Sequence, residues 1–152
     1  MGRMYSAVMD AVAVTAAKDL MRLSAPSDAV VIIHEVKVSQ ESDAGDSESE
    51  QVAVQLQRSS TDGTGTSTTP EKMEPSDAAF GGTCVTNLTV DTSISGSPLR
   101  RTSDNVHNAP HWLFTPETRP VVPPSGRFVV RLDKAPADSL TMSLTVVFEE
   151  VG

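Results

Sequence analysis

The sequence contains very little cysteine. Its one cysteine, Cys84, has no second thiol in the chain with which to form a disulfide, so folding does not require an oxidising compartment. A single thiol also excludes zinc and iron–sulfur centres built from several cysteines. We therefore expect synthesis in the cytoplasm and a buried, structural role for Cys84.

Basic residues and long apolar runs are also scarce. Twelve Lys and Arg against 20 Asp and Glu give a formal net charge of -8 over 152 residues. Phosphate backbones and anionic lipid headgroups attract positive surfaces, so we expect neither a nucleic-acid nor a membrane partner. No run reaches the roughly 20 apolar residues of a transmembrane helix. Asp10 interrupts the apolar N-terminal segment, so we also expect no cleaved secretory leader.

Aromatic residues make up only 4% of the chain and all hydrophobic residues 38%, which predicts a thin core. Valine is the dominant apolar residue, and serine and threonine are abundant. β-Branched side chains fit strands better than helices, so this composition favours β-structure. Ten prolines and nine glycines provide many turns.

Apolar and polar residues alternate along several segments, as in strands with one buried face. The predicted strands cover residues 30–38, 52–56, 84–90, 111–115, 128–132 and 140–148. In the first of them, Val30, Ile32, His34, Val36 and Val38 are expected to share a face. Residues 4–23 fit a helix by alanine content and a strand by their alternation. The strand is the preferred interpretation.

These segments predict an all-β, single-domain protein over residues 1–152. Short strands separated by turns are typical of an antiparallel β-sandwich, and we expect a jelly-roll topology. Three long polar loops interrupt the strands, at about 39–50, 59–83 and 109–125.

No residue pattern predicts catalysis, a cofactor or a metal site. His107 and His111 have the spacing of a zinc pair, but Pro110 between them disfavours a helix and no further ligands follow. His34 is next to Glu35, and we expect a core histidine there rather than a base. The acidic residues of 39–50 lack the EF-hand order of calcium ligands. We therefore predict a protein that is not an enzyme.

Two groups of residues are candidate contacts with a partner. Trp112 and Phe114 are two of only six aromatic residues, and aromatic side chains dominate both cores and interfaces. They are expected either to close one end of the sandwich or to anchor a subunit or capsid contact. Arg100, Arg101 and Arg119 are candidates to meet acidic groups on a partner.

The chain resembles small proteins encoded among the virion genes of tailed bacteriophages. The matching segments are AVAVTAAKDL (11–20), LSAPSDAVVIIHE (23–35), DAAFGGT (77–83), RPVVPPSGR (119–127) and APADSLTMSLTVVFEE (135–150). This family resembles capsid decoration, or cement, proteins. The resemblance implies a structural protein on the capsid surface, made in the host cytoplasm. Its implied partners are the major capsid protein and copies of itself, as a homotrimer.

Two alternative functions remain open at this point. One is a tail- or fibre-associated module that recognises a receptor such as a host glycan, for which Trp112 is the strongest candidate. The other is an enzyme on a related β-fold, such as a cupin-like metalloprotein, because a fold alone does not determine function.

Overall fold

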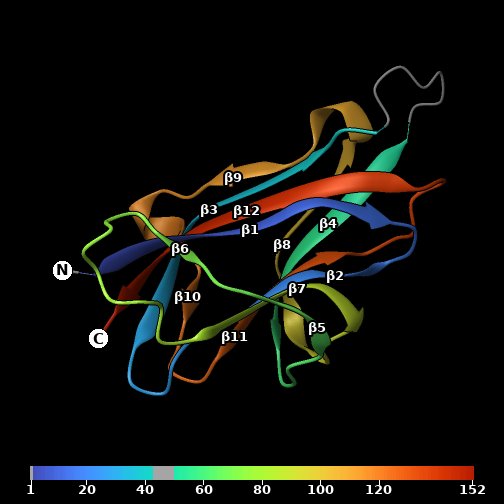
Figure 1. Ribbon diagram of the computed structural model, residues 1–152. Coiled ribbons are helices and arrows are strands. Elements are labelled where there is room, and N and C mark those ends of the chain that lie inside the picture. The colour runs from blue at the N-terminus through green and yellow to red at the C-terminus, as the bar shows by residue number, and fades with distance from the viewer. Residues whose placement is uncertain (1, 43–49) are drawn as a thin grey trace.

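The computed structural model describes residues 2–42 and 50–152 and consists of two antiparallel β-sheets that share one core (Figure 1). Within these residues the only helices are two short 3₁₀ turns, and no helix has the length and apolar character that crossing a membrane requires. The elements are β1 (Arg3–Val14), β2 (Lys18–Ser24), β3 (Val30–Gln40), β4 (Gln51–Ser59), β5 (Thr64–Thr68), β6 (Glu71–Lys72), β7 (Thr83–Val90), β8 (Ile94–Asn105), η1 (Val106–Asn108), β9 (His111–Leu113), η2 (Pro116–Thr118), β10 (Val121–Val122), β11 (Arg127–Leu132) and β12 (Leu140–Val151).

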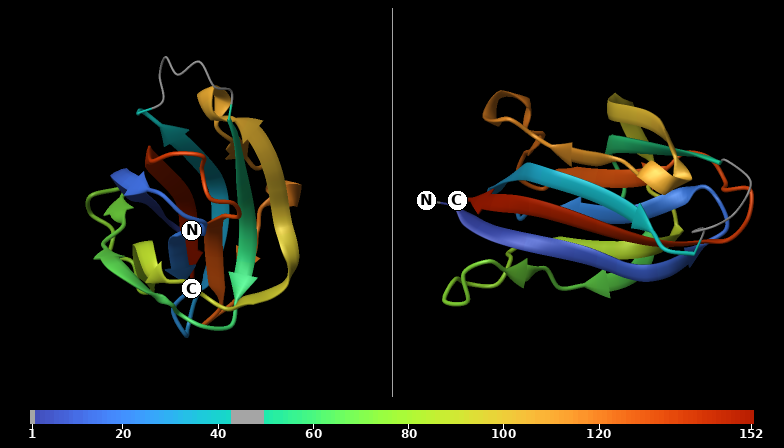
Figure 2. Two further views of the ribbon diagram at one scale, coloured as in Figure 1. Left: turned by 90° about the vertical axis from the view of Figure 1, so that its right-hand side faces the viewer. Right: turned by 90° about the horizontal axis from the view of Figure 1, so that it is seen from above.

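The strand order defines two sheets, which we call the first and the second sheet. The first sheet runs β10-β3-β12-β1-β6, with β9 also paired to β3, and the second runs β5-β7-β2-β11-β4-β8. The chain crosses repeatedly from one sheet to the other (Figure 2): between β1 and β2, β2 and β3, β3 and β4, β5 and β6, β6 and β7, β8 and β9, β10 and β11, and β11 and β12. The prediction of an all-β protein with antiparallel sheets is therefore confirmed.

The core lies between the sheets and is built by the alternation that the sequence predicts. Along β12, alternate residues from Leu140 to Phe148 are buried, and in β11 Phe128, Val130 and Leu132 are buried as expected. The aromatic rings of Tyr5, Phe80 and Phe148 pack against one another, with ring centroids 4.9 to 5.6 Å apart. Cys84 is 2% exposed, in agreement with its predicted structural role.

Residues 4–23 are two strands, which confirms the strand interpretation, but a bulge changes which side chains face inward. The register of β1 against β12 shifts between Met9 and Val12, and Ala11 adopts a positive φ of 47°. A bulge adds a residue to one strand and reverses the alternation beyond it. Val14 is therefore buried, whereas Ala11 and Ala13 are exposed.

A second bulge corrects the predicted face of β3. The register of β3 against β12 shifts at His34, which lies between Ile33 and Glu35 and has no paired residue. Val31, Ile33, Val36 and Val38 are therefore the buried residues. The prediction that Val30, Ile32, Val36 and Val38 share a face with His34 was wrong, because a period of two cannot continue through the extra residue.

The segments expected as long loops contain short edge strands. Residues 59–83 place β5 beside β7 in the second sheet and β6 beside β1 in the first, so they close one side of the sandwich. The hydroxyl of Tyr5 donates to the carbonyl of Ala78 at 2.9 Å, which holds this segment against the core. In residues 109–125, β9 and β10 pair with β3. Of the predicted loop 39–50, residues 43–49 lie outside the described residues.

Candidate binding surfaces

One side of the sandwich is open, where the edge strand β8 of the second sheet faces β9 and β10 of the first. Paired residues project from the same face of a sheet. Arg100, Thr102 and Asp104 of β8 lie opposite the buried Leu56, Val54 and Val52 of β4 and therefore project inward. These inward positions are polar and line two hollows. The space between the sheets is therefore less completely filled by side chains on this open side.

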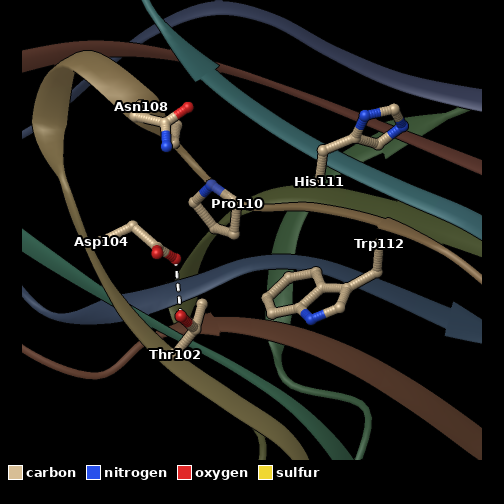
Figure 3. A pocket seen from close by; sticks show the side chains of 7 residues that line it. Thr102, Asp104, Asn108, Pro110, His111 and Trp112 are labelled. Atoms are coloured by element: carbon tan, nitrogen blue, oxygen red, sulfur yellow. Dashed lines mark hydrogen bonds between the residues drawn. The ribbon is translucent and has the colours of Figure 1, made fainter.

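The first hollow has a volume of about 340 Å³ and is lined by Thr102, Asp104, Pro110, His111 and Trp112, with Asn108 and Ala109. The indole of Trp112 points into it, and the carboxylate of Asp104 accepts a hydrogen bond from Thr102 at 2.6 Å (Figure 3). The imidazole of His111 points away and lies 2.7 Å from a carboxylate oxygen of Glu35. His111 and Asp104 therefore do not converge on one point.

The second hollow, which we call the arginine hollow, brings together two of the predicted contact residues. Its volume is about 330 Å³, and Arg58, Arg100 and Arg119 line it together with Glu117 and the apolar residues Leu99, Pro120 and Val121 (with Thr118). Arg58 comes from β4, Arg100 from β8, and Arg119 follows η2. Sequence reasoning missed Arg58, because only the register of β4 places it beside the other two.

The neighbouring Arg101 lies outside this hollow. Arg101 is paired with Gln55, one position along from Arg100, and therefore projects from the opposite face of the second sheet. Its guanidinium donates to Asp133 at 2.8 Å. Half of its side chain is exposed, so this is a surface ion pair.

The two predicted aromatic contacts have different environments. Phe114 is 7% exposed and belongs to the core cluster, and its backbone N–H donates to the carbonyl of His34 at 3.0 Å. Trp112 is partly buried and packs against the same core from the open side. Phe114 thus closes the sandwich as the sequence suggested, while Trp112 also contributes to the wall of a hollow.

The outer face of the first sheet carries a set of exposed apolar side chains, which we call the apolar face. Leu113 is 74% exposed, Val8 46% and Val121 45%. Leu113 is paired with Glu35, which is paired in turn with Val147, and Val121 is paired with Ile32. Their side chains therefore project on the side of the sheet away from the core. Isolated apolar residues on a surface are common, but several on one face of a sheet are typical of an interaction surface.

Charged side chains lie among these apolar residues. His34 approaches Glu149 at 3.2 Å, and His111 approaches Glu35. The prediction of a core His34 was wrong, because the bulge in β3 turns its side chain to the outer face. In the part of the chain that the structure describes, no cluster of three or more His, Cys, Asp or Glu side chains could hold a metal ion.

Burial controls the chemistry of the only thiol. Desolvation raises the pKa of Cys84 to about 12, partly offset by the nearby charge of Arg22. Because the thiolate is the reactive form, the native protein should react with Ellman's reagent at pH 8 at least about a hundredfold more slowly than the protein unfolded in guanidinium chloride. Cys84→Ser gives the background. Equal rates in the two states would contradict the burial of this side chain.

Together these features describe an all-β protein with two antiparallel sheets, an apolar outer face and an open, arginine-lined side. No protein-family model, curated protein or solved structure matches the chain.

Proposed function

We propose that the two sheets form a jelly roll with one inserted segment. The strand order supports this proposal. If β5, β6 and β7 are set aside as the insertion and β9 with β10 counts as one strand, the chain has eight strands in sequence. The first sheet then has the order 1-8-3-6 and the second 2-7-4-5. Two such four-stranded sheets, linked as interlocking Greek keys, are the arrangement of a jelly roll.

We further propose that the protein is a non-enzymatic structural component of a tailed-phage virion that decorates the capsid exterior. The observation that carries the proposal is the apolar face, because a sheet surface with several exposed apolar side chains is suited to burial against another protein. The resemblance in sequence to virion proteins supports the same role. The partners in this proposal are the major capsid protein and further copies of the chain, as a homotrimer.

The proposed mechanism is mechanical. Each subunit lies across neighbouring capsomers, so that separating them requires breaking several contacts at once. A standard protein interface buries about 1,600 Å². Repetition over the shell then resists internal pressure through many simultaneous contacts rather than through one strong bond.

The experiment is a sedimentation assay with phage heads that lack the protein. Purified protein is added, the heads are sedimented, and the bound copies per head are counted. We expect saturation at a copy number in the hundreds, set by the symmetry of the shell. Binding of only a few copies would instead favour a tail location, and no binding would reject the virion role.

Variants of the apolar face make this test specific. Leu113→Glu combined with Val8→Glu places two charges on the proposed interface and should abolish most of the binding, because a buried unpaired charge is strongly unfavourable. Val90→Glu is the matched control, since Val90 is 58% exposed on β7 of the second sheet. Equal binding by both variants would exclude the apolar face as the contact.

A further inference from the structure

The arginines of the chain divide into two groups by their partners. Five form ion pairs with carboxylates: Arg3 with Glu150, Arg22 and Arg127 with Asp62, Arg101 with Asp133, and Arg131 with Asp19. The other three are Arg58, Arg100 and Arg119. Among the described residues, none of these three has a carboxylate at ion-pair distance, and all three line the arginine hollow.

This concentration of unpaired positive charge contrasts with the rest of the molecule. The chain has a net charge of -8, and five of its eight arginines have a carboxylate partner. Glu117 lines the hollow but makes no ion pair with the three arginines in the part of the chain that the structure describes. Like charges around one cavity repel one another, and a bound anion removes that repulsion.

One nitrogen of an arginine that lines the hollow also lacks a hydrogen-bond acceptor. The Nε atom of Arg119 is buried and has no partner among the described residues. Burying an N–H without an acceptor is unfavourable, and each such group calls for an explanation. The guanidinium of Arg119 therefore has an unused donor that the oxygen of a bound carboxylate can satisfy.

We propose that the arginine hollow binds carboxylate side chains from an acidic segment of a protein partner. The planar guanidinium donates two parallel hydrogen bonds that match the two oxygens of a carboxylate. Leu99 and Pro120 supply apolar walls against which the aliphatic part of a Glu side chain packs. A nucleic-acid backbone is the less favoured anion, because the remainder of this acidic surface repels it.

This proposal goes beyond the virion role and does not depend on it, because the ligand is defined only by its carboxylates. Sedimentation with heads and peptide binding are separate measurements, so either can fail while the other succeeds. Val121 borders both the hollow and the apolar face, whereas Val8 and Leu113 belong to the apolar face alone, so the charged variants at Val8 and Leu113 leave the lining of the hollow unchanged.

The test uses a fluorescently labelled peptide of alternating Glu and Leu, with binding followed by anisotropy. The full-length protein should bind it, added salt should weaken the binding, and the same peptide with Gln in place of Glu should not bind. Arg100→Gln and Arg119→Gln should each weaken binding about tenfold, as expected for the loss of a charge-assisted hydrogen bond. Arg119→Lys keeps the positive charge but loses the planar guanidinium that donates two parallel hydrogen bonds, so this variant should have an intermediate affinity.

Arg101→Gln is the matched control. It removes the same charge one residue along β8, but from the opposite face, and should change the affinity by less than about twofold. Equal losses for Arg100→Gln and Arg101→Gln would overturn the proposal, as would equal binding of the Gln peptide or no binding of the Glu peptide.

If inorganic phosphate binds more tightly than the peptide and Arg119→Gln abolishes its binding, the hollow is a phosphate site and the proposal is wrong. Circular dichroism verifies that each variant is folded.

Discussion

Replacing Asp19 with alanine is expected to lower the free energy of unfolding by about 3–5 kcal/mol, the usual cost of breaking a buried ion pair. The side chain of Asp19 is fully buried, on the outer side of the second sheet beneath residues 91–94. Its carboxylate accepts hydrogen bonds from Nε of Arg131 at 2.5 Å, from the Thr92 backbone N–H at 2.6 Å and from the Thr92 hydroxyl at 2.7 Å.

The loss is large because three donors lose their acceptor together. Burial by itself lowers the pKa of Arg131, but the hydrogen bond and charge of Asp19, with the charges of Asp91 and Asp133, raise it above its ordinary value. Arginine stays charged at neutral pH, so in Asp19→Ala the guanidinium of Arg131 remains charged with its main partner gone. The double variant Asp19→Ala/Arg131→Ala should recover part of the loss, because no unpaired charge remains.

Urea unfolding followed by the fluorescence of the single tryptophan measures these changes. Arg101→Ala is the matched control, because the ion pair of Arg101 with Asp133 lies at the surface and should contribute less than about 1 kcal/mol. A loss for Asp19→Ala no greater than that of the control would mean that the buried pair does not hold residues 91–94 against the sheet.

Replacing Phe148 with alanine is expected to lower the free energy of unfolding by a similar amount, about 3–5 kcal/mol. The side chain is fully buried at the centre of the aromatic cluster, stacked on Tyr5 at 5.6 Å and edge-on to Phe80 at 4.9 Å. Alanine leaves a cavity beside the rings of Tyr5 and Phe80, and the surrounding core relaxes only in part to fill such a space.

The same unfolding measurement tests this prediction. Phe148→Leu should cost less than Phe148→Ala, because leucine fills more of the space. Leu113→Ala removes an apolar side chain that is 74% exposed and should stay within about 0.5 kcal/mol of the parent protein. If Phe148→Ala lost less than about 1 kcal/mol, the aromatic cluster would not be a main source of stability.

Much of the fold could be predicted from local patterns. Alternation identified the strands that became β3, β4, β7, β9, β11 and β12, and it favoured strands in residues 4–23. It failed at Ala11 and at His34, where a bulge adds one residue to a strand. A bulge is stabilised by the partner strand and by the core, so nothing in the local pattern indicates its position.

The candidate site could also be predicted only in part from the sequence. Arg100 and Arg119 could be selected as unusual basic residues, but the sequence also selected Arg101, which lies on the other face of β8. Arg58 could not be selected, because it is 42 residues from Arg100 in the sequence and reaches the hollow only through the pairing of β4 with β8.

The sequence by itself determined the class of structure and the character of the surface. Valine-rich alternation specifies strands with one buried face, and a single cysteine excludes disulfides within the chain. Asp and Glu outnumber Lys and Arg, so a cluster of basic residues without acidic partners is unusual in this chain. Only the tertiary structure decided which residues meet. Strand register, bulges and the open side are set by long-range pairing and packing, and these depend on residues far apart in the chain rather than on neighbours within one segment.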